Sequence, residues 1–312
     1  MKDIGFVGLG HMGGAIARRL ASQCRLIVFD LDTHRVEELV RLGARAAIDL
    51  PQLAQECDVI FTCLPTSEHV RHVVFGEGGL GGELGSGALV IDCTTGDPNQ
   101  ARTIAAELAE RGVEFVDAPV SGGPQGAAKG TLAFIVGSSS ATYERARVPL
   151  QLISPNVRRV GEVGAGQCVK LLNNVLAAGH RMLAFETAIA AAANAVDPEV
   201  FIDTVNLATG RSYATEVTMV RHIFGERLDQ DFSVGLMAKD VRLGVQLVPE
   251  SLRRESLILQ VAERLDSAER VLGSHSDINR LIELYERAAD KIVATSRRDS
   301  DSGGVFAPTD WP

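Results

Sequence analysis

Three glycines near the start of the chain have the spacing that binds a dinucleotide. Gly8, Gly10 and Gly13 form the pattern G-x-G-x-x-G, directly after an apolar run typical of a strand. The first glycine permits a tight turn, the second lets the backbone approach a pyrophosphate, and the third lets a helix pack closely on the strand. The following helix offers unpaired N–H groups to the phosphates. His11 and Met12 lie between the glycines, and we expect both at the cofactor, with no catalytic role for His11.

Asp30 is the acidic partner that this motif requires. It ends the next apolar run, about 20 residues after Gly10, where a carboxylate is expected to bind the adenosine ribose hydroxyls. Such a carboxylate would accept a hydrogen bond from a ribose 2′-OH and repel a 2′-phosphate, so NAD is favoured over NADP. Arg35 would favour NADP, but it lies inside the next predicted helix, where a solvated helix face is the commoner explanation.

The elements that carry these residues alternate up to about residue 163, as in βα units around a mostly parallel sheet. Short runs rich in Val, Ile and Phe are apolar at successive positions, which is typical of strands covered on both faces. Helical spacing falls between them, and Asp97-Pro98 has the residue types of an N-cap followed by proline at the first helical position. The predicted strands are residues 4–7, 26–29, 59–63, 89–92, 115–117 and 132–136, and the predicted helices 14–21, 35–42 and 100–111.

The pattern changes after Gly164. Residues 167–194 form one long run rich in Ala and Leu, and helical periodicity continues to about residue 294. We therefore predict an α/β domain over residues 1–163, which binds the dinucleotide, and an all-α domain over residues 164–295, which serves substrate binding and oligomerisation. Residues 296–312 are polar and rich in Gly and Pro, and we expect a flexible tail there, with the only tryptophan, Trp311.

Composition excludes several other classes of protein. The 31 basic and 40 acidic residues leave a formal net charge of −9, and Arg and Lys are scattered, unlike the basic stripe of a nucleic-acid-binding protein. No apolar run is long enough to span a bilayer, so we expect neither a nucleic-acid nor a membrane partner. Five cysteines without C-x-x-C spacing argue against a disulfide framework or a metal site. With no secretory signal, we expect a cytoplasmic protein.

Beyond the glycine loop, the chain resembles the β-hydroxyacid dehydrogenase family, which includes 3-hydroxyisobutyrate dehydrogenase and tartronate semialdehyde reductase. The resemblance extends over residues 2–294, almost the whole chain, and four segments in the right order make it specific. These segments are residues 5–13, residues 117–132 with Ser121-Gly122-Gly123, residues 164–174 with Lys170, Asn173 and Asn174, and Lys239-Asp240.

This resemblance implies both a fold and a reaction. The fold is a Rossmann-type N-terminal domain, a long interdomain helix and a helical C-terminal domain. The reaction is reversible hydride transfer between a nicotinamide cofactor and a short 3-hydroxy acid, and we rank 3-hydroxyisobutyrate first. As in the family, we expect a homodimer or homotetramer, because the long helix carries more Ala and Leu than one buried stripe requires.

The resemblance also gives Lys170 the role of general acid and base. Lys170 and Asn174 are spaced i, i+4 with Gln167 at i−3, so all three project from one helix face. A lysine with an ordinary pKa near ~10.4 is a poor base at neutral pH, so burial or a neighbouring cation must lower that pKa. Lys239 would supply the cation and also bind cofactor and substrate. Asn174 would orient the reacting hydroxyl or the Lys170 amine.

Other residues are assigned to binding. Ser121, Gly122 and Gly123 combine a hydroxyl with unshielded backbone N–H groups, which suits a substrate carboxylate. Leu64, Pro65 and Thr95 follow predicted strands, at the sheet edge where ligands bind. In the family, positions like these contact the adenosine side (Leu64 and Pro65) and the nicotinamide ribose (Thr95).

Three alternatives stay open or are disfavoured. A reductase of tartronate or succinate semialdehyde would use the same residues in the reverse direction. A non-catalytic dinucleotide-binding sensor would need the glycine loop but not Lys170, Asn174, Ser121 and Lys239 together. Oxidative decarboxylation of the 6-phosphogluconate type is disfavoured, because the glutamate that the reaction needs seven residues after the lysine is Ala177 here.

Overall fold

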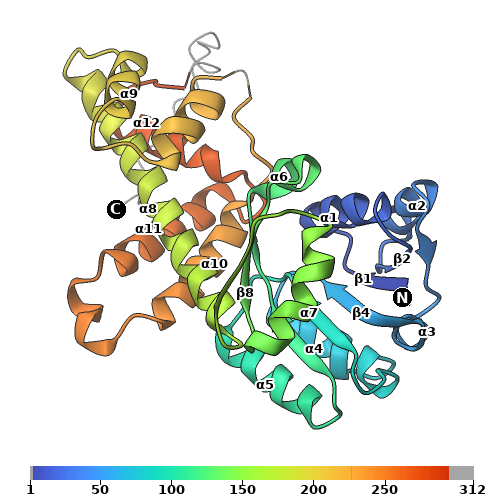
Figure 1. The fold of residues 1–312 in the computed structure, drawn as a ribbon. Coiled ribbons are helices and arrows are strands. Elements are labelled where there is room, and N and C mark those ends of the chain that lie inside the picture. The colour runs from blue at the N-terminus through green and yellow to red at the C-terminus, as the bar shows by residue number, and fades with distance from the viewer. Residues whose placement is uncertain (1–2, 226, 295–312) are drawn as a thin grey trace. The chain divides into compact units, whose positions relative to one another are not determined.

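Figure 1 shows the protein as a computed structural model that describes residues 3–225 and 227–294. The chain divides into two compact units, the first ending at Lys170 and the second beginning at Leu171. The long helix α8 (Ala165–Ala193) begins in the first unit and continues in the second. Each unit has its own hydrophobic core. The tail predicted at residues 296–312, with Trp311, lies outside the described residues.

The first unit is built on a sheet with the strand order β3-β2-β1-β4-β5-β6-β8-β7, in which β9 pairs with β8. The strands from β3 to β6 run parallel, and β8 runs antiparallel to both β6 and β7. The order reverses at β1, with β2 on one side and β4 on the other, and ligands of open α/β sheets bind at such a switch point. The strands are β1 (Asp3–Val7), β2 (Leu26–Phe29), β3 (Arg45–Ala46), β4 (Cys57–Thr62), β5 (Leu89–Asp92), β6 (Glu114–Asp117), β7 (Val120–Ser121), β8 (Ala133–Gly137) and β9 (Val157–Gly161).

The central strands are buried on both faces, as their apolar runs predict. Successive residues of β1 divide between two core clusters: Phe6 packs with Phe61 of β4 on one face, and Val7 packs with Ile60 on the other. The rings of Phe6 and Phe61 stack with centroids 5.7 Å apart. The predicted doubly covered sheet is therefore confirmed.

Helices cover this sheet, and polar side chains fix where several of them begin. Asp97 accepts a hydrogen bond from the N–H of Asn99 at 2.7 Å, and Pro98 opens the helix, which confirms the predicted cap. Asp32, Asp49, Thr66 and Ser139 cap four further helices in the same way. The helical elements of the unit are α1 (His11–Ala21), α2 (Thr33–Arg41), α3 (Leu50–Glu56), α4 (Ser67–Phe75), η1 (Leu80–Gly82), α5 (Pro98–Ala109), α6 (Gly123–Lys129) and α7 (Ser140–Gln151).

The second unit is helical, as predicted. Its core gathers Phe185 of α8 with apolar residues from the later helices. α8 and α10 cross closely at Gly244, where a Cβ would lie 2.7 Å from a methyl of Val175. The other helical elements are α9 (Pro198–Asn206), η2 (Ala214–Ile223), α10 (Val234–Gln246), η3 (Glu250–Glu255), α11 (Leu257–Leu272), η4 (Ile278–Arg280) and α12 (Leu281–Ala289). Among the described residues, no helix has the length and apolar character needed to cross a membrane.

Candidate active site

The glycine loop after β1 has the geometry of a phosphate cradle. Gly8 has φ +92°, a conformation that side chains rarely adopt, and a Cβ on Gly13 would collide with the Gly8 carbonyl oxygen. A Cβ on Gly10 would meet only the Arg35 guanidinium, at 3.6 Å. Gly10 is the N-cap residue of α1 and provides no side-chain cap, and His11 and Met12 open that helix. The loop therefore fits a pyrophosphate at the start of α1.

Asp30 lies directly against this loop. One carboxylate oxygen accepts a hydrogen bond from the N–H of Leu9 at 2.5 Å, and the other accepts one from the N–H of Asp32 at 2.8 Å. The loop and the end of β2 are thus tied together through one carboxylate. Its predicted contact with an adenosine ribose remains a prediction.

Arg35 is closer to this site than we expected. It lies in the first turn of α2, where its Nε makes an ion pair with Asp32 at 3.1 Å. Its guanidinium also approaches Gly10. We had expected Arg35 only on a solvated helix face, away from the glycine loop. Its position in the first turn of the helix after β2 could have predicted this approach, because that turn lies near the glycine loop.

Buried polar residues brace the loops at the carboxyl ends of β4 and β5. Asp92 accepts hydrogen bonds from the hydroxyl of Thr62 at 2.8 Å and from the N–H of Thr94 at 3.0 Å. The Thr94 hydroxyl in turn accepts one from the N–H of Leu64 at 3.0 Å. The predicted Leu64 and Thr95 are half-buried at this edge, and Pro65 is exposed. Sequence reasoning missed Asp92 and Thr94.

A second set of contacts holds the first turn of α8 at the same edge. The fully buried Asp117 accepts hydrogen bonds from the N–H of Gly164 at 2.7 Å and of Gln167 at 2.9 Å. The Gln167 side chain donates to the Thr94 carbonyl at 2.7 Å and accepts from the N–H of Gly96 at 2.9 Å. Burial raises the pKa of Asp117 to about 7, although the two backbone N–H groups oppose the shift. We call this set of contacts the α8 clamp. Lys170, half-buried, lies one turn further along α8.

The predicted carboxylate loop also lies in the first unit. Ser121 ends β7, and Gly122 and Gly123 have φ values of +126° and +64°. Gly122 is the N-cap residue of α6 without a side-chain cap, and α6 contacts α1 of the glycine loop. The loop thus presents a hydroxyl and unshielded backbone beside the helix that opens the predicted cofactor site.

In the second unit, Asn174, Asp240 and Lys239 form a connected polar cluster. The Asn174 amide donates to Asp240 at 2.6 Å, and the Lys239 ammonium makes an ion pair with the other oxygen of Asp240 at 3.0 Å. Asn174 and Asp240 are both buried. The resemblance assigned Lys239, and resemblance and helical spacing together assigned Asn174; Asp240 received no place in the site, although it joins the two.

Comparisons with known proteins agree with this architecture. The family model described as the NAD binding domain of 6-phosphogluconate dehydrogenase matches residues 3–164, and the one described as NAD-binding of NADP-dependent 3-hydroxyisobutyrate dehydrogenase matches residues 164–285.

Individual proteins match over most of their length. The chain is 32% identical to 2-(hydroxymethyl)glutarate dehydrogenase of Eubacterium barkeri, over 91% of this chain and 95% of that protein. It is 36% identical to the NAD-dependent L-serine dehydrogenase of Pseudomonas aeruginosa, over 80% of this chain and 87% of that protein. The solved structure of Mycobacterium tuberculosis 3-hydroxyisobutyrate dehydrogenase with L-serine superposes with a TM-score of 0.81 at 28% identity, over 91% of this chain and 98% of that one. The chain therefore belongs to the β-hydroxyacid dehydrogenase family of nicotinamide-dependent oxidoreductases.

Proposed function

We propose that this protein is an NAD-dependent dehydrogenase that oxidises the hydroxyl of a short 3-hydroxy acid, with 3-hydroxyisobutyrate ranked first. The observation that carries the proposal is the polar cluster of Asn174, Asp240 and Lys239, in which Asn174 and Asp240 are buried and Lys239 is half-buried. A buried ion pair with its hydrogen bonds satisfied is often no more stable than apolar residues of the same volume, and dinucleotide binding alone does not require one in a helical unit. Family membership supplies the reaction class.

Lys170 is the residue to which we assign the proton. In the oxidation Lys170 removes the proton of the substrate hydroxyl while a hydride leaves the carbon that bears this hydroxyl. In the reverse direction the Lys170 ammonium donates a proton to the forming alkoxide. The nicotinamide supplies the hydride acceptor when the cofactor is bound. Because Asp240 already pairs with Lys239, the charge of Lys239 is partly offset, and we assign Lys239 to binding more than to lowering the pKa of Lys170.

Substrate and cofactor binding complete the assignment. Ser121, Gly122 and Gly123 bind the substrate carboxylate through the hydroxyl and backbone N–H groups. Gly8, Gly10 and Gly13 admit the pyrophosphate, Asp30 binds the adenosine ribose, and Leu64, Pro65 and Thr95 contact the rest of the cofactor. NAD is preferred because Asp30 repels a 2′-phosphate. NADP is the second candidate, and the approach of the Arg35 guanidinium to Gly10 is the observation that favours it.

One assay tests the proposal. The purified protein is mixed with NAD or NADP and with 3-hydroxyisobutyrate, L-serine or 2-(hydroxymethyl)glutarate, and the absorbance of reduced nicotinamide is followed. The reverse direction is assayed with tartronate and succinate semialdehydes and reduced cofactor. We expect turnover with at least one hydroxy acid. Binding of NAD without turnover in either direction would show instead that the protein is a non-catalytic sensor.

A further inference from the structure

Arg181 is a buried cation that the proposed reaction does not use. It lies on α8, seven residues after Asn174, and only 4% of it is exposed. Its Nε donates to the Asn279 amide oxygen at 3.1 Å, and its Nη2 donates to the Gln230 amide oxygen at 3.1 Å. Its Nη1 is buried and has no hydrogen-bond partner. In the described part of the chain, no carboxylate makes an ion pair with Arg181.

This arrangement is unfavourable for an arginine whose role is only structural. Buried arginines are almost always paired with an anion, because an uncompensated charge is costly to remove from water. Burial lowers the pKa of Arg181 to about 10, so the guanidinium remains a cation at neutral pH. The acidic residue that acts on it most is Asp277, whose carboxylate accepts hydrogen bonds from the backbone N–H groups of Gln230, Phe232 and Asn279. Asp277 therefore has its own partners.

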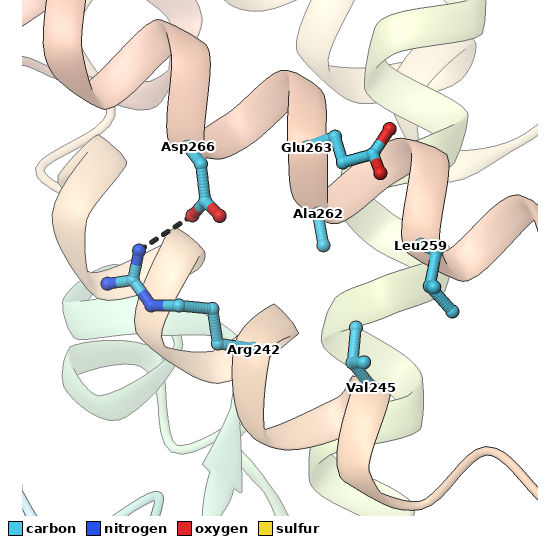
Figure 2. A pocket seen from close by; sticks show the side chains of 6 residues that line it. All are labelled: Arg242, Val245, Leu259, Ala262, Glu263 and Asp266. Atoms are coloured by element: carbon cyan, nitrogen blue, oxygen red, sulfur yellow. Dashed lines mark hydrogen bonds and ion pairs between the residues drawn. The ribbon is translucent and has the colours of Figure 1, made fainter. Parts of the chain in front are cut away.

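Another arginine of the same unit shows how this protein pairs a guanidinium. Arg242 of α10 makes ion pairs with Asp266 at 2.7 Å and with Glu269 at 3.0 Å, both on α11. Figure 2 shows the Asp266 pair in the small pocket between these helices, a hollow of about 220 Å³. Arg242 needs no ligand because it has two carboxylates. Arg181 has only neutral partners, so the contrast points to a missing anion.

The surroundings of Arg181 connect it to polar and solvent-facing groups. Tyr213, which is 68% exposed, is near enough that its ionised phenol would raise the pKa of Arg181, so Arg181 lies near a group in contact with water. Tyr213 precedes η2, an unusual ten-residue π-helix that contacts η4, the element of Asn279. Thr218 of η2 also has a buried hydroxyl without a partner. Helical segments of the π type are frequently found at functional sites.

Helix geometry puts Arg181 on the same face of α8 as Asn174. Seven residues are almost two full turns, which is a rise of roughly 10 Å along the helix axis. Side chains of a helix lean toward its N-terminus, so the long Arg181 side chain can shorten that distance. A substrate with a chain of four or five carbons from its hydroxyl end, placed at Asn174, to its other end would extend toward the guanidinium.

We propose that Arg181 binds a second, distal carboxylate of the substrate, so that the preferred substrate is a 3-hydroxy acid carrying another anionic group. This inference rests on the proposed function, narrows its substrate class to 3-hydroxy acids with a second anionic group, and places these ahead of 3-hydroxyisobutyrate. Nη1 donates to the distal carboxylate, and the charge of that group compensates the buried guanidinium. A methyl group in the same place, as in 3-hydroxyisobutyrate, leaves Nη1 of Arg181 without a hydrogen-bond partner.

The wild-type protein provides the first test. We expect kcat/KM for 2-(hydroxymethyl)glutarate to exceed that for 3-hydroxyisobutyrate and L-serine by at least about tenfold. Independently of turnover, glutarate should raise the melting temperature in the presence of NAD, whereas butyrate at the same ionic strength should not. Equal use of the mono- and dicarboxylate hydroxy acids would overturn the inference and leave the dehydrogenase assignment intact. Glutarate binding without any turnover would support the subsite and contradict the assigned reaction.

Matched variants provide the second test. Arg181→Met should lower kcat/KM for 2-(hydroxymethyl)glutarate by at least about tenfold, mainly through KM, and change that for 3-hydroxyisobutyrate far less. Arg181→Lys should keep part of the preference, because it keeps the charge. Arg242→Met is the control, since it removes an arginine that already has carboxylate partners, and it should leave the ratio unchanged. An equal loss on both substrates in Arg181→Met would show a purely structural role. If Arg181→Met does not fold, the wild-type comparison of glutarate with butyrate decides.

Discussion

At the scale of single residues, the glycines of the loop after β1 have two separable roles. A Cβ on Gly13 would collide with the Gly8 carbonyl, whereas one on Gly10 would meet only a flexible guanidinium at 3.6 Å. We expect Gly10→Ala to keep the melting temperature within a few degrees and to weaken NAD binding, because the methyl occupies the pyrophosphate approach. Gly13→Ala should lower the melting temperature markedly. Thermal unfolding and NAD titration measure both, and equal destabilisation by the two variants would contradict this division.

We expect the cofactor preference to depend on Asp30 and Arg35. We expect kcat/KM with NAD to exceed that with NADP by at least about tenfold, or about 1.4 kcal/mol, because Asp30 repels a 2′-phosphate. Asp30→Ala should narrow the gap, mostly by weakening NAD, since the carboxylate also holds the Leu9 N–H. Arg35→Ala should widen the gap between the two cofactors, because the substitution removes the cation beside Gly10 that would attract a 2′-phosphate. Steady-state kinetics with both cofactors measure the gap, and equal efficiency of the wild type with NAD and NADP would show the preference to be wrong.

If Lys170 transfers the proton, substituting it should affect the reaction and not cofactor binding. Lys170→Ala should leave NAD affinity nearly unchanged and lower kcat by ~10² to 10⁴, the usual range for a positioned acid and base. Lys170→Arg should restore little, because a guanidinium stays protonated near neutral pH. Single-turnover kinetics together with NAD titration make the comparison. If Lys170→Ala keeps more than about a tenth of wild-type turnover, another group transfers the proton, and Lys239 is the next residue to test.

Sequence reasoning at this scale depends on local signals. The glycine spacing and the position of Asp30 follow from a strand–turn–helix unit, and the structure joins them through the Leu9 N–H. Asp117, Asp240 and Arg181 gave no such signal, because their partners are distant in the sequence: Gly164, Asn174 and Asn279. The roles of the assigned site residues stay predictions that these variants test.

At the scale of elements, the α8 clamp predicts a dependence on pH. The pKa of Asp117 rises in the folded state from its ordinary value of 3.8 to about 7 because of burial. The folded state thus binds the proton more tightly than the unfolded state. The stability that this provides is full below the unfolded pKa and is lost as the pH rises to about 7.

Asp117→Asn cannot titrate at this position, so it isolates the effect. The difference in unfolding free energy between the wild type and Asp117→Asn should be larger at about pH 5 than at about pH 8, by roughly 3 kcal/mol. Gln167→Ala breaks the same clamp but keeps the carboxyl group, so its difference from the wild type should stay constant with pH. Urea unfolding at both pH values measures these differences. If the difference in unfolding free energy between the wild type and Asp117→Asn is the same at both pH values, the Asp117 carboxyl stays ionised in the folded state.

Apolar strands of about four residues or more were predictable from the sequence, whereas two-residue strands and a strand with charged residues were not. β5 (Leu89–Asp92) is apolar at three successive positions and was predicted with its observed bounds. β3 and β7 have two residues each, too few to show a periodicity, and β9 carries two arginines on a half-buried edge. The antiparallel pairing of β8 with β6 was also missed, because direction depends on the connection and not on the strand residues.

At the scale of the whole molecule, α8 leaves apolar side chains in contact with water. Leu176 and Leu183, seven residues apart on one helix face, are each 60% exposed, while Phe185 of the same helix is fully buried. One buried stripe therefore does not use all the apolar residues of this helix, and an exposed apolar stripe of this kind is typical of an interface between copies of a chain. We expect a homodimer or homotetramer, with α8 in the contact.

Light scattering at micromolar concentration tests this expectation against the monomer mass of 33.3 kDa. The wild type should give at least twice that mass, and Leu183→Glu should shift it toward the monomer, because an unpaired charge is costly to bury in an apolar contact. Leu207→Glu is the matched control: Leu207 is 91% exposed and follows α9, outside the α8 stripe, so the same substitution there should leave the mass unchanged. A wild type that scatters as a monomer would contradict the prediction outright. An oligomer that both variants leave intact would mean that the copies meet through another surface, and the exposed stripe of α8 would then need a different explanation.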